Sequence, residues 1–148
     1  MEKAKLLIQE LAQLAGTELE FQENAICELA VEGRLLLLRY RPEDDDWLYF
    51  GFVTDGEEEL SAEQLKKALS LNLFGAETYG LHLGLFAQSL ILSGTVPMDG
   101  LNAEGLAEKL LFLSKCIAQL SEKLQSDDSG AVASIPSELP FGANLISV

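Results

Sequence analysis

Few residues of this chain have the type and spacing that catalysis needs. His82 is the only histidine, and it lies in a predicted strand whose Leu81, Leu83 and Leu85 occupy the opposite face. A histidine works as a general base when it can reach a nucleophile or a substrate proton, and no nucleophile motif accompanies His82. Phosphate-binding glycine loops, nucleophile elbows and metalloprotease helices are also absent from the sequence. We therefore interpret His82 as a partly buried or interface histidine.

The acidic runs Glu43–Asp46 and Glu57–Glu59 are the candidates for cation binding. Because they lack the alternating ligands and central glycine of a calcium loop, we expect solvated turns that keep the chain soluble. Cys27 and Cys116 lie far apart in apolar patterns, which fits neither a disulfide framework nor a metal site. No basic neighbour would make either thiol reactive. The sequence therefore predicts two structural thiols, no metal, no cofactor, no enzymatic activity and a cytosolic location.

Composition excludes two classes of partner. The 148 residues include 10 Lys+Arg against 24 Asp+Glu, a formal net charge of -14. Nucleic acids and anionic membrane surfaces need clustered lysine and arginine, so we predict that the chain binds neither. No run reaches the ~18 apolar residues of a membrane span, and polar residues interrupt the amphipathic N-terminus, which therefore does not resemble a secretion signal.

Periodicity predicts three helices and five short strands. A helical stripe runs over residues 4–15, and Ser61 with Gln64 forms a capping box for a second helix. Asn102 is the predicted N-cap of the last helix. The strands are predicted at residues 25–31, 34–41, 47–53, 81–86 and 89–96. The order α-βββ-α-ββ-α indicates an α+β fold with an antiparallel sheet.

Two features of this pattern bear on the surface of the protein. The second strand has four consecutive leucines, Leu35 to Leu38, from which we expect a central strand covered on both faces. From Ser126 the composition changes to Ser, Gly, Ala and Pro without basic residues through Ser137. We predict one domain over residues 1–125 and a flexible C-terminal tail over residues 126–148.

The apolar content of the chain is high for a small sheet with three helices. One interpretation is a dense core. The other is an exposed apolar patch that binds partners or a second copy, with the acidic surface offsetting the risk of aggregation. The residue pattern by itself leaves both open.

The chain resembles the class I type III secretion chaperones of the Tir chaperone (CesT) family. Four stretches over about residues 3–125 carry the likeness: KAKLLIQELAQLAG with ELEFQENAICELAVEG, SAEQLKKALSLNLF, LHLGLFAQSLILSGTVPMDGLN, and AEGLAEKLLFLSKCIAQLSEKL. The aromatic run WLYFGFV and the tail depart from the family pattern. The resemblance implies a homodimer in the bacterial cytoplasm. It also implies that the protein binds an extended N-terminal segment of a secreted effector and keeps it secretion-competent without ATP.

Specific residues are assigned to the two implied surfaces. We expect the second helix to form the dimer interface through Leu65, Leu69, Leu73 and Phe74. The first helix and the late strand pair are expected to form the effector groove through Leu7, Ile8, Leu11, Leu83 and Leu85. The alternative function is a regulatory interaction protein, of the anti-activator type, of a secretion regulon.

Overall fold

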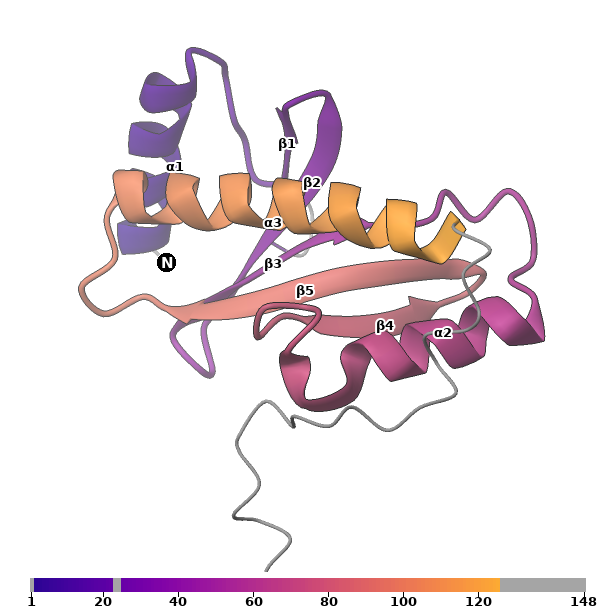
Figure 1. Ribbon diagram of the computed structural model, residues 1–148. Helices are drawn as coiled ribbons and strands as arrows, with labels where there is room; N and C mark the ends of the chain where they lie inside the picture. Colours follow the sequence, from indigo (N-terminus) through magenta and orange to yellow (C-terminus); the bar gives the residue numbers. More distant parts are fainter. Residues whose placement is uncertain (1, 23–24, 126–148) are drawn as a thin grey trace, which may run out of the picture.

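The computed structural model describes residues 2–22 and 25–125, and they form one sheet with three α-helices (Figure 1). The predicted flexible tail, residues 126–148, lies outside the described residues. The elements, in chain order, are α1 (Glu2–Ala15), β1 (Ile26–Val31), β2 (Arg34–Arg41), β3 (Asp46–Phe52), α2 (Ala62–Asn72), the short 3-10 helix η2 (Leu73–Gly75), β4 (His82–Phe86), β5 (Ser89–Pro97) and α3 (Ala103–Gln125). The predicted order α-βββ-α-ββ-α is confirmed.

The five strands pair antiparallel in the order β1-β2-β3-β5-β4, so β1 and β4 are the two edges. A tight turn sets the register of the first hairpin. Glu32 and Gly33 both have positive φ, 51° and 79°, as a two-residue type I′ turn requires. The turn joins the paired residues Val31 and Arg34.

The capping interactions predicted for the N-termini of α2 and α3 are present. The Ser61 hydroxyl accepts from the Gln64 backbone N–H at 3.1 Å, and the Gln64 side chain accepts from the Ser61 N–H at 2.9 Å. The Asn102 side chain accepts from the Gly105 N–H at 2.8 Å, which caps α3. These bonds satisfy backbone donors that have no partner inside a helix.

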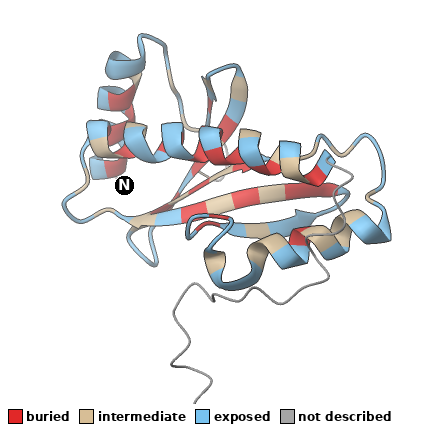
Figure 2. Ribbon diagram, viewed as in Figure 1, coloured by how far each residue is buried: buried red, intermediate tan, exposed pale blue. Residues whose placement is uncertain are grey.

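The buried apolar residues of the sheet lie on one face, beneath α3 and α1. The helix α3 crosses β1, β2, β3 and β5, and α1 packs against α3. Figure 2 shows the buried stripe of α3 turned toward the sheet. Gly51 makes the close approach possible, since a Cβ there would stand 2.6 Å from Ile117 Cδ1. The apolar residues that recur every three or four positions along α3 are entirely buried: Leu106, Leu110, Leu113, Ile117, Leu120 and Leu124.

The expectation of a second strand covered on both faces is wrong. Leu36 and Leu38 are fully buried beneath α3, whereas Leu35 is half-exposed on the other face. In the described part of the chain, no helix covers that second face, because α1 and α3 both lie on the first. The apolar residues on it must therefore be explained by something other than the core of this chain.

Candidate functional site

The uncovered side of the sheet, which we call the open face, is apolar across its central strands. The registers place Leu37 opposite Phe50 and Phe52 opposite Ile91, and Leu35 lies beside the Leu36–Gly51 pair on the same face as Leu37. The face also includes Leu48, the third residue of β3, opposite Arg39. Its side chains are half-buried or exposed, although they are large and apolar. The apolar residues of the open face are Leu35, Leu37, Leu48, Phe50, Phe52 and Ile91, and the exposed Arg39 borders them opposite Leu48.

A second apolar surface lies at the β4 edge, where α2 runs alongside the strand (Figure 1). Leu69 is 72% exposed, Leu73 58% and Phe74 54%, while Leu65 is half-buried. Figure 2 shows α2 and β4 as mostly exposed or intermediate. Phe74 has a φ of 59°, a strained left-handed conformation for a bulky residue. The residues predicted for the dimer interface thus lie together on one surface, and their role in dimerisation stays a prediction.

The residues predicted for the effector groove do not lie together. Leu7, Ile8 and Leu11 are buried in the core, under α1. Leu83 is half-buried and Leu85 is exposed on β4, which pairs with β5 and contacts α2. Since α1 packs on α3, the two halves of the expected groove belong to different parts of the molecule. Their part in partner binding stays a prediction.

The two edges of the sheet differ in the state of their backbone groups. At β4, the Asn72 side chain accepts from the Leu83 N–H at 2.9 Å and donates to the Leu83 carbonyl at 3.2 Å. Asn72 therefore occupies the Leu83 position of that edge as a neighbouring strand would. At β1, the closing pair of the hairpin turn directs the N–H and C=O groups of Glu28 and Ala30 away from β2. At the start of β1 the Ile26 carbonyl accepts from the Gln22 N–H at 2.7 Å. Among residues 2–22 and 25–125, the outward groups of Glu28 and Ala30 have no such partner, so this part of the β1 edge can accept an added strand.

The side chains considered as catalytic or metal-binding candidates do not form a common site among the described residues. His82 is exposed on β4 opposite Ser93. Cys27 and Cys116 are free and buried, and burial raises the pKa of both thiols, with the Glu28 carboxylate adding to the effect on Cys27. A raised pKa disfavours the reactive thiolate. Within residues 2–22 and 25–125, no three acidic, histidine or cysteine side chains gather as a metal site.

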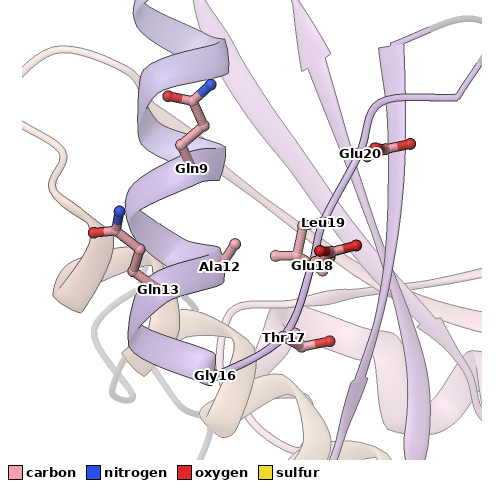
Figure 3. Close-up of a pocket in the computed structure, with 8 residues that line it drawn as sticks. All are labelled: Gln9, Ala12, Gln13, Gly16, Thr17, Glu18, Leu19 and Glu20. Atoms are coloured by element: carbon pink, nitrogen blue, oxygen red, sulfur yellow. The ribbon is translucent and has the colours of Figure 1, made fainter.

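A hollow between the end of α1 and residues 17–20 has a mixed polar and apolar lining (Figure 3). Ala12 and Leu19 point toward each other, while Gln9 and Gln13 point away from the following segment. The lining includes carboxylates and amides but neither an imidazole nor a thiol. Among the residues that the structure describes, 2–22 and 25–125, no helix has the length and apolarity for crossing a bilayer.

Comparison with known proteins agrees with this geometry. Residues 6–123 match the model of the Tir chaperone protein (CesT) family. No curated protein sequence matches the chain. Three solved structures share the fold at low identity. The chain is similar to one in the ExsC-ExsE complex (19% identity, TM-score 0.70, 83% of this chain and 93% of that chain). It is also similar to one in the HopA1-SchA chaperone-effector complex (18%, 0.63, 81% and 94%). The third is in the complex of the Yersinia pestis type III secretion chaperone SycH with a YscM2 fragment (20%, 0.60, 79% and 98%).

Proposed function

Because this chain belongs to the Tir chaperone protein (CesT) family, we propose that it is a type III secretion chaperone in the bacterial cytoplasm. It binds an extended N-terminal segment of a secreted effector and keeps that segment soluble and secretion-competent. The free energy of binding is enough to hold the segment in this state without ATP, because the segment covers apolar surface that the chaperone leaves exposed.

The open face is the observation that carries this proposal. Leu37, Phe50 and their neighbours form an apolar surface that no described helix covers. Monomeric soluble proteins seldom expose such a patch without a binding role. The net charge of -14 keeps a protein with this surface in solution. Chains of the same fold have been solved in complexes, one of them described as a chaperone-effector complex.

The free β1 edge supports an extended conformation for the bound segment. A strand added beside Glu28 and Ala30 would satisfy their outward N–H and C=O groups and continue the sheet. Asn72 already occupies the corresponding groups of Leu83 on β4, so strand addition favours β1. Backbone pairing at the edge and side-chain contacts on the open face can hold one segment together.

The protein acts as a homodimer through the surface formed by α2, η2 and β4. Obligate interfaces are large and apolar, and the exposed Leu69, Leu73 and Phe74 provide such a surface. We expect a mass near twice 16.1 kDa by light scattering at micromolar concentration. Leu69→Asp should give a monomer, while Ser70→Asp, at the next exposed position of α2, should stay dimeric. A monomeric native protein would contradict the dimer.

The function is tested by co-purification from the native host, with mass spectrometry of any protein that elutes in stoichiometric amount. We expect a larger protein with a secretion-type N-terminus, encoded beside this chain. Phe50→Asp should abolish its recovery, because a charge on the open face must lose its water when the partner binds. The matched variant Glu108→Asp, on an exposed position of α3, should recover the partner normally. Recovery of a transcriptional regulator instead would favour the anti-activator function.

A further inference from the structure

The open face has different electrostatic surroundings at its two ends. Beyond Phe52, the chain continues into an acidic loop that contains Asp55, Glu57, Glu58 and Glu59, all of them exposed. At the other end, Arg41 donates to Asp46 at 2.7 Å through Nε and lies 3.8 Å from Asp44. The exposed Arg39 lies between the two ends, opposite Leu48. One end of the face therefore combines carboxylates with a paired arginine, whereas the Phe52 end, farther from Arg39, presents a loop of carboxylates alone.

The acidic loop and the open face are continuous through Phe52. A hollow of about 510 Å³ lies at this end of the sheet, beside the last turn of α3. Phe52 of the open face lines it together with Leu60, with Leu124 of α3 and with the loop carboxylates. Lysine and arginine bury an apolar stem while the charged head stays in water among acceptors. Arg34 begins β2 at this end of the sheet, but strand alternation places it on the face that α3 covers.

We infer that the open face takes an extended partner segment in which alternate apolar residues are followed, on the Phe52 side, by lysine or arginine. This rests on the proposed function and adds the chemistry that the bound segment must have. Every second residue of the partner segment is apolar and covers Leu37, Phe50 and Phe52. The lysine or arginine side chain that follows enters the hollow beside Glu57–Glu59.

Charge argues against two other occupants of the face. A second copy of this chain brings another net charge of -14 toward the acidic loop. The chain's own residues 126–148 include apolar residues such as Phe141, but they contain three acidic residues and no lysine or arginine. A partner with basic residues complements the loop, whereas both internal candidates repel it.

Short labelled peptides of alternating leucine and serine test this inference by fluorescence anisotropy on the full chain. Two of the peptides carry a pair of lysines, one peptide at its N-terminus and the other at its C-terminus. Two otherwise identical peptides carry a pair of glutamates at the same positions. We expect the better lysine peptide to bind about fivefold to tenfold more tightly than its glutamate counterpart at low salt. This preference should shrink at high salt, because exposed charges are screened.

Matched variants assign the preference to the loop. The preference for the lysine peptide should disappear in a triple variant that combines Glu57→Gln, Glu58→Gln and Glu59→Gln. Neutralising Glu10, Glu104 and Glu108, exposed on α1 and α3, changes the net charge equally and should leave it intact. Equal effects of the two triple variants would overturn the inference. The proposed function would survive that result if the effector still bound and Phe50→Asp still abolished its binding.

A thiol probe on the open face tests the other occupants. Leu35→Cys adds an exposed thiol to a chain whose two cysteines are buried. We expect fast maleimide labelling in the free protein and protection by the lysine peptide. Protection without peptide that grows with protein concentration would assign the face to a second copy. Protection independent of concentration would assign it to residues 126–148. Either result would overturn the inference, and circular dichroism checks that each variant is folded.

Discussion

Truncating one leucine of α1 should reveal whether this helix belongs to the core or to a binding groove. Leu11 is 2% exposed, and Leu14, one turn later on the same helix, is 53% exposed. A leucine-to-alanine change in a core typically costs about 2–5 kcal/mol, through lost burial and the cavity left behind. Surface substitutions are usually within about 0.5 kcal/mol. We therefore expect Leu11→Ala to lose about 3 kcal/mol of unfolding free energy and Leu14→Ala almost none.

Trp47 provides the signal for this measurement. It is the only tryptophan, it is fully buried, and its ring stacks on Phe21 with centroids 6.1 Å apart. Phe21 lies in the segment that connects α1 to β1, so unfolding of this region should change the fluorescence. Urea unfolding at one fixed protein concentration gives the free energies, since dimerisation contributes to apparent stability. A loss of 3 kcal/mol corresponds to a melting temperature lower by about 6–12 °C in a domain of this size.

Equal stability of the two variants would refute the burial of α1. If Leu11→Ala also lost effector binding while it remained as stable as the native chain, the groove expected from the sequence would be correct. If Leu11→Ala is destabilised and the folded fraction binds its effector normally, Leu7, Ile8 and Leu11 act only as core residues.

Three further predictions concern stability. Gly94→Ala should cost about 1–3 kcal/mol by overpacking, because a Cβ there would stand 2.6 Å from the Tyr49 ring, whereas Gly84→Ala on β4 meets open space and should be neutral in thermal melts. Asn102→Ala should cost about 1 kcal/mol in urea unfolding, as the loss of an N-cap does. Burial raises the pKa of Cys27 and Cys116 above 9.0, so the folded state holds their protons longer than the unfolded state. The stability from this effect is complete below pH 9 and should fall as pH rises above it, which pH-dependent unfolding can measure; stability that rises there would contradict the burial.

The sequence determined the elements and their order because their signals are local. The capping box at Ser61, the N-cap at Asn102 and the apolar repeat along α3 each depend on residues within one helix. The Glu32-Gly33 turn likewise needs only the conformations of two residues. Such patterns specify backbone conformation and the side of an element that must be buried, whichever neighbour buries it. The family resemblance, drawn from the same apolar patterns, was also confirmed.

Tertiary structure alone decided which apolar side chains are covered. Leu35 and Leu36 are identical and adjacent, yet only Leu36 lies beneath α3. Alternation told us that they face opposite sides, but not that both large helices would cover the same side. Leu11 and Leu69 show the converse, since similar leucine stripes on α1 and α2 are buried in one case and exposed in the other. Whether a helix stripe is core or interface depends on contacts distant in sequence, and those contacts are what make the open face and the α2 surface available to partners.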